Sequence, residues 1–72
     1  MTTFMKLDGS VVANNEPTIV NVAQIKGVSK VMVGCNAIFL DGDHKVFTKL
    51  SLDEVFDALR GLHIPGVTLI KV

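Results

Sequence analysis

The stretch "LDGDHKVFTKLSLDEV", residues 40–55, carries the clearest local signals for the fold of this chain. Asp-Gly at 41–42 lies between two runs in which apolar and polar residues alternate, the strongest short-range signal of a β-hairpin. We therefore predict a hairpin with strands at 37–40 and 45–50. The same Leu-Asp-Gly triplet occurs at 7–9, again between two strand-like runs, and there too we predict a hairpin turn.

A helix is predicted immediately after this hairpin, over residues 51–61. Ser51 can cap its free amides, and Glu54, three residues later, completes a capping box. Gly61 is suited to the left-handed conformation that ends many helices. The apolar side chains of one helix face are expected to cover a sheet, and they are Leu52, Val55, Phe56 and Leu59.

The other strand-like runs surround this unit, and turn-forming residues separate them. Asn-Asn-Glu-Pro at 14–17 is expected to break the chain, and Gly27 is expected to end a strand. The runs themselves are 3–7, 11–13, 19–25, 30–33 and 67–72. We predict an α+β fold: a small sheet of four or five mainly antiparallel strands with one α-helix, at about 51–61, packed on one face.

Length and composition limit the classes of protein to consider. We expect the 72 residues to form one domain, 1–72, and 49% of them are hydrophobic, which suits an aliphatic core. The single cysteine, Cys35, cannot close an internal disulfide, so we expect a reducing, cytoplasmic location. No apolar run reaches the roughly 18 residues of a membrane span. The net charge of zero argues against nucleic acid as the main partner and does little to prevent self-association.

Asp41, Asp43 and His44 stand within four positions and raise the question of a metal or catalytic site. A calcium loop needs oxygen ligands spread over about twelve residues, and this cluster is too short. We interpret it as an exposed hairpin tip. Cys35 with His44 or His63 has no third group to orient a nucleophile–base pair, and a packed thiol is the simpler interpretation. We predict no catalytic residue, no metal and no cofactor.

Four lysines of the middle strands are the candidate binding residues. If these strands are neighbours, the lysines could gather on one side of the sheet and contact an acidic surface. The alternative is that they keep the protein in solution and discourage edge-to-edge pairing of strands. An exposed apolar residue among them, such as Met32 or Phe47, would favour a protein partner. The predicted protein-binding residues are Lys26, Lys30, Met32, Lys45 and Lys49.

The order of these parts resembles a family of small, β-rich prokaryotic and phage proteins that includes the FlbD-like proteins of flagellar operons. The matching segments are "KLDGSVV", "NEPTIVNV" with Asn15, Ile19 and Val22, and "LDGDHKVFTKLSLDEV". The resemblance covers about residues 4–60. It departs from the family at Leu50, where a charged residue is common, and the 61–72 tail lies outside it. The family contributes no catalytic residue.

A broader similarity, of size and of absent enzyme motifs, is to small phage-encoded proteins that bind host RNA polymerase. We therefore predict a non-enzymatic protein-binding module, with bacterial RNA polymerase as the most specific expected partner. The host cytoplasm would be its location if a phage encodes it. The alternatives are an oligomeric structural or motility-associated protein joined through an open strand edge, and a small nucleic-acid-binding domain.

Overall fold

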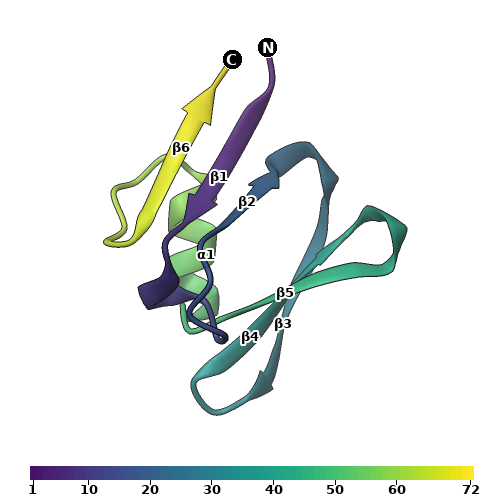
Figure 1. Ribbon diagram of the computed structural model, residues 1–72, viewed down its shortest axis with the longest axis vertical. Helices are drawn as coiled ribbons and strands as arrows, with labels where there is room; N and C mark the ends of the chain where they lie inside the picture. The colour runs from purple at the N-terminus through teal and green to yellow at the C-terminus, as the bar shows by residue number, and fades with distance from the viewer.

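The computed structural model describes residues 1–72 and contains six strands in two antiparallel sheets, with one α-helix (Figure 1). The first sheet has the order β2–β1–β6, formed by Thr18–Asn21, Thr3–Leu7 and Val67–Lys71. The second has the order β3–β4–β5, formed by Ile25–Met32, Cys35–Leu40 and His44–Thr48. Helix α1 is Leu52–Leu59. The predicted α+β class with antiparallel strands and one helix is confirmed, and the strands are divided between two sheets of three.

The hydrophobic core contains residues from both sheets and from the helix. Met5 and Leu7 alternate along β1, so both point to the same side of their sheet, and both are fully buried. Ile38 is their counterpart on β4. The other buried members of this core are Val12, Val20, Leu50, Val55 and Ala58. The inner face of each sheet thus contributes side chains to the core.

Helix α1 begins as predicted. The Ser51 hydroxyl accepts a hydrogen bond from the Glu54 amide at 3.1 Å, and the Glu54 carboxylate accepts one from the Ser51 amide at 2.9 Å. Gly61, with φ of 88°, is in the left-handed region just after the helix. No helix of the protein has the length and apolar character needed to cross a membrane.

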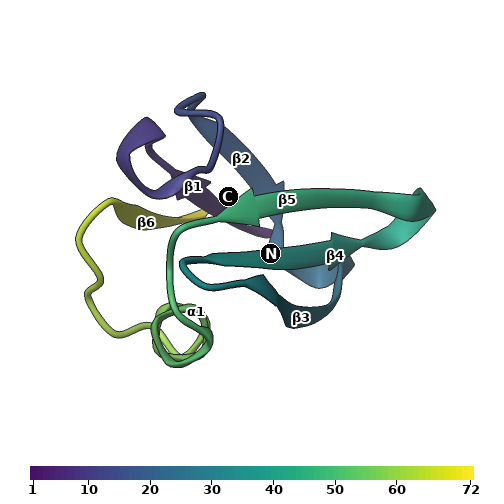
Figure 2. The same cartoon turned by 90° about the horizontal axis from the view of Figure 1, so that it is seen from below.

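The predicted apolar stripe of this helix is only partly buried. Val55 and Ala58 are buried, but Leu52 is 45% exposed and Phe56 is 59% exposed. Figure 2 shows α1 on one face of the β2–β1–β6 sheet, beside the β3–β4 turn, and of its residues only Val55 and Ala58 are fully buried in the shared core. A helix in that position buries a narrow line of residues, and the rest of its apolar side stays in solvent.

The segment predicted as a second strand, 11–13, has a different structure. Asp8 caps a short 3₁₀ helix, Gly9–Val11, by accepting a hydrogen bond from the Ser10 amide at 2.9 Å. The chain then joins β5 through one bridge, between Val12 and Thr48. The predicted hairpin at Asp8-Gly9 is therefore wrong. Asp8 caps a helical turn in place of a hairpin turn, and the residues that follow pair with β5 and not with β1.

Strand β3 is also longer than predicted. It runs from Ile25 to Met32 without stopping at Gly27, so residues 30–33 do not form a separate strand. Gly27 does not have the positive φ that a turn would require; the first such glycine is Gly34, at 77°, between β3 and β4. The pairing with β4 shifts register twice, between Ile25 and Gly27 and between Lys30 and Met32.

The hairpin prediction for the opening stretch is confirmed. β4 and β5 pair from Asn36–Thr48 to Leu40–His44, and Asp41–Asp43 form the tight turn between them. Gly42 has φ of 79° and Asp43 has φ of 62°, values that glycine and aspartate tolerate better than most residues. Figure 1 shows this turn projecting from the body of the molecule, and its residues are exposed.

Candidate protein-binding site

The outer face of the β3–β4–β5 sheet carries the strongest candidate site. Residues directly opposite each other in an antiparallel pair point to the same face. Val28, Ile38 and Val46 form one such row and pack in or against the core. The next row along the strands, formed by Gly27, Phe39 and Lys45, therefore points away from the core. The row formed by Ser29, Ala37 and Phe47 is on the same side as Phe39, although its middle residue, Ala37, is fully buried.

Two phenylalanines stand on this face with a lysine next to both. Phe39 is 37% exposed and Phe47 is 40% exposed. The Lys45 ammonium lies 5.9 Å from the centroid of the Phe39 ring and 6.0 Å from that of Phe47. Both distances are at the limit for attraction between a cation and an aromatic ring. The lysine is thus held over apolar surface while its charge stays available to solvent.

Gly27 leaves open space beside Phe39. A Cβ atom added at Gly27 would meet nothing within 4 Å, and its φ is outside the positive range, so its backbone does not require glycine. Glycine inside a strand weakens the strand and often marks a place where a ligand or another chain approaches closely. This row therefore places three features side by side on neighbouring strands: the open position at Gly27 on β3, the ring of Phe39 on β4 and the ammonium of Lys45 on β5.

The face continues over the β5 edge into a shallow hollow. Lys45 and Phe47 contribute to its lining, and the hollow has a volume of about 280 Å³. Its other lining residues are Val12, Ala13, Asn14, Thr18 and Val46. The segment 12–14, which was expected to be a strand and its turn, is thus part of the surroundings of this face.

The five predicted binding residues do not form a single cluster. Lys45 lies on the outer face as described, and Met32, which is exposed, pairs with Cys35 at the other end of the sheet. Lys26 lies at the first register shift of β3. Lys30 pairs with the buried Asn36 and therefore belongs to the inner face, at its rim. The Lys49 ammonium, beyond the end of β5, donates a hydrogen bond to the Asn15 side chain at 3.1 Å.

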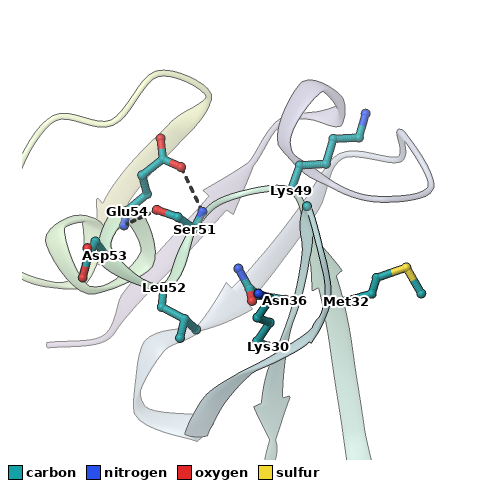
Figure 3. A pocket seen from close by; sticks show the side chains of 9 residues that line it. Lys30, Met32, Asn36, Lys49, Ser51, Leu52, Asp53 and Glu54 are labelled. Atoms are coloured by element: carbon teal, nitrogen blue, oxygen red, sulfur yellow. Dashed lines mark hydrogen bonds between the residues drawn. The ribbon is translucent and has the colours of Figure 1, made fainter.

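Lys30, Met32 and Lys49 do meet around a second hollow, of about 440 Å³, between the β3–β4 turn and the start of α1 (Figure 3). Three of its polar side chains, Asn36, Ser51 and Glu54, already have partners. The Asn36 amide donates to the Leu50 carbonyl at 2.6 Å, and Ser51 and Glu54 bond each other in the capping box. Figure 3 shows Lys49 and Met32 pointing away from Leu52 rather than toward a common centre. This hollow therefore has no convergent set of ligand-binding groups.

Sequence reasoning did not select Phe39 and Gly27, which lie beside Lys45 on this face. The alternation of residues 37–40 was a usable signal, because a hairpin with its turn at Asp41–Asp43 places Phe39 on the same face as Phe47. Gly27 gave a misleading signal, since a glycine between strand-like runs usually indicates a turn.

The titratable residues of the chain are dispersed. Asp41, Asp43 and His44 lie at the exposed hairpin tip, and no group of three or more His, Cys, Asp or Glu side chains is placed to hold a metal ion. Cys35, at the start of β4, is at the opposite end of the hairpin from His44. Asp8 is the one group with a shifted pKa: hydrogen bonds from the Ser10 hydroxyl and the Ser10 amide lower it.

No protein-family model, no curated protein and no solved structure matches this chain.

Proposed function

We propose that this protein is a non-enzymatic protein-binding module and that the outer face of β3–β4–β5 contacts the partner. The observation that carries the proposal is the pair of half-exposed phenylalanines, Phe39 and Phe47, on the same face of the β3–β4–β5 sheet. Aromatic side chains, phenylalanine among them, are enriched at protein interfaces relative to the rest of the protein surface.

The face also indicates the chemistry of the partner. The open position at Gly27 has room for an apolar side chain, which would pack against the ring of Phe39. A carboxylate beside it would pair with the Lys45 ammonium. A standard interface takes about 800 Å² from each partner, roughly a sixth of the 4612 Å² accessible surface of this protein.

Bacterial RNA polymerase is the partner we propose to test first, with the bacterial cytoplasm as the location. This choice rests on the similarity in size and character to small phage proteins that act on that enzyme. The direct experiment measures binding of the purified protein to purified bacterial RNA polymerase by biolayer interferometry at low and moderate salt. A pull-down from bacterial lysate with the same protein, read by mass spectrometry, identifies other partners.

Three variants test the face itself. Phe47→Ser and Lys45→Glu are expected to weaken partner binding by about tenfold or more, as interface anchors do. Phe56→Ser is the matched control, because Phe56 is an exposed phenylalanine on the helix, outside this face. Binding that is unchanged by Phe47→Ser and lost in Phe56→Ser would contradict the proposed face. Stoichiometric binding to another protein, lost in Phe47→Ser, would support the face and exclude the polymerase.

A further inference from the structure

Strand β6 is an open sheet edge, and its backbone shows which groups are free. Thr2 and Val72 exchange hydrogen bonds, with N···O distances of 2.8 and 2.9 Å, and the Asp8 amide donates to the Gly66 carbonyl at 2.9 Å. Hydrogen-bonded pairs alternate in an antiparallel ladder, so Ile70 and Thr68 also bond to β1. The backbone groups of Val67, Leu69 and Lys71 therefore point to the outside of the sheet.

The other three sheet edges are protected. β2 has four residues and follows Pro17, which cannot donate a hydrogen bond. β3 has two register shifts and carries Lys26 and Lys30. β5 is covered at its end by the segment 11–13, since the Ala13 amide donates to the Phe47 carbonyl at 2.9 Å and the Lys49 amide donates to the Val11 carbonyl at 2.8 Å. Short length, bulges, proline and lysine are the usual means of blocking an edge.

β6 lacks most of these protections. It is five residues long, with the sequence VTLIK, it contains no proline, and its pairing with β1 is regular. Its one lysine, Lys71, stands at the end of the strand. Beside it, a groove of about 390 Å³ separates the strand from the end of α1. Ala58, Leu62 and Leu69 are among the residues that line this groove, and Leu62 is 50% exposed.

We propose that β6 pairs antiparallel with β6 of a second copy of this chain, joining two β2–β1–β6 sheets into one continuous sheet. The two-fold axis passes beside Leu69, so each Leu69 exchanges hydrogen bonds with its counterpart. Lys71 then lies opposite Val67 of the other copy. Two-fold symmetry is the commonest symmetry of homo-oligomers.

The free backbone groups argue for this register. The Val67 amide is already bonded to the Ile64 carbonyl at 3.0 Å, so β6 has free donors only at Leu69 and Lys71. In the proposed register Leu69 bonds Leu69, and the Lys71 amide meets the free carbonyl of Val67. Every free donor of each copy therefore finds an acceptor, and no amide faces another amide.

The side chains and charges fit the same pairing. Val67 and Leu69 point to the inner side of the sheet, as Met5 and Leu7 do, because they are paired with those residues. In the dimer the same side chains of the second copy lie over the groove and cover Leu62. The two Lys71 residues lie at opposite ends of the interface, each near the second copy's Asp8, which adjoins Gly66. The zero net charge of the chain adds no general repulsion.

The first test is the mass of the purified chain, with reducing agent present, by sedimentation equilibrium over a range of concentrations. We expect a monomer–dimer equilibrium. Lys71→Pro removes an outward amide without removing a bond to β1, and it should raise the dissociation constant of the dimer about tenfold or more. Lys71→Thr is the matched control: it removes the charge, keeps the amide, and should leave dimerisation within about threefold of the unchanged protein.

The second test remains informative if Lys71→Pro fails to fold. In a Cys35→Ala background, Thr68→Cys and Ile70→Cys should form a disulfide between copies when mixed, faster than either variant alone, because residues 68 and 70 are opposite each other in this register. A monomer at millimolar concentration would overturn the proposal. So would a dimer that is unaffected by Lys71→Pro, or one whose mixed cysteines do not cross-link.

Discussion

At the scale of single residues, two glycines of this protein have opposite environments. Gly27 has ordinary strand geometry and open space around it, whereas Gly66 has φ of 86° and a Cβ added there would lie 2.7 Å from Val11 Cγ1. Gly27→Ala should therefore raise the free energy of unfolding by about 0.4–1 kcal/mol, by restricting the unfolded chain. Gly66→Ala should lower it by about 1 kcal/mol or more. Urea denaturation of both variants checks the pair, and equal destabilisation would contradict the open position at Gly27.

Thr48 is a buried polar residue whose hydroxyl joins two parts of the chain. It donates to the Val11 carbonyl at 2.6 Å and accepts from the Leu50 amide at 3.1 Å. Thr48→Val keeps the shape but leaves both backbone groups without this partner, and should lower the free energy of unfolding by about 1–3 kcal/mol. Thr48→Ser, which keeps the hydroxyl, should cost less than Thr48→Val. If urea denaturation shows Thr48→Ser to be the less stable variant, the packing of the Thr48 methyl group, and not its hydrogen bonds, determines the loss of stability.

The Asp8 carboxylate gives one pH dependence with a definite sign. Its pKa lies below the ordinary 3.8, chiefly because the Ser10 hydroxyl and the Ser10 amide donate hydrogen bonds to it. A lowered pKa stabilises the fold at pH values above 3.8, and this contribution is lost as the pH falls through the lowered pKa. Ser10→Ala should raise the pKa of Asp8, which an NMR titration of the carboxyl carbon measures. An unchanged titration in Ser10→Ala would show that the amide alone lowers the pKa.

At the scale of elements, the capping box helps to explain why so short a helix begins where it does. Helix α1 has eight residues, too few to be stable in isolation, and Ser51 satisfies one of its free amides. Ser51→Ala should lower the free energy of unfolding by about 0.5–2 kcal/mol. Ser51→Asp keeps an acceptor at the same position and should recover most of the loss. Thermal unfolding followed by circular dichroism compares the three proteins.

The elements that sequence reasoning predicted correctly are those that local chemistry determines. Asp41–Asp43 and Ser51 act through neighbours only a few residues away, so the turn and the helix start could be predicted from the chain itself. The division into two sheets depends on long-range pairing, of 11–13 with β5 and of β6 with β1, which no local pattern specifies. The candidate face needed the register of β3, and the shifts at Lys26 and after Lys30 are not visible in the pattern of apolar residues.

At the scale of the whole molecule, the two ends of the chain lie together (Figure 1), held by the bonds between Thr2 and Val72. A circular permutant that joins residue 72 to residue 1 through a short linker, with new ends at Gly42 in the exposed turn, should fold to the same structure. An NMR amide spectrum with most shifts unchanged is the expected result. The matched control opens the chain between Asn36 and Ala37, in the central strand β4, and should not fold. A permutant at Gly42 that fails to fold would mean that the β4–β5 connection must be intact for the sheet to form.

The same closeness of the two ends determines how this protein responds to force. A load applied between the N- and C-termini acts across the first rung of the β1–β6 ladder and at right angles to both strands, because the strands are antiparallel and their ends are adjacent. The rungs then break one after another, as in a zipper, and never share the load as they would in shear. Stretched by its termini, the molecule should open at low force, with β6 peeling away before the β3–β4–β5 sheet is disturbed.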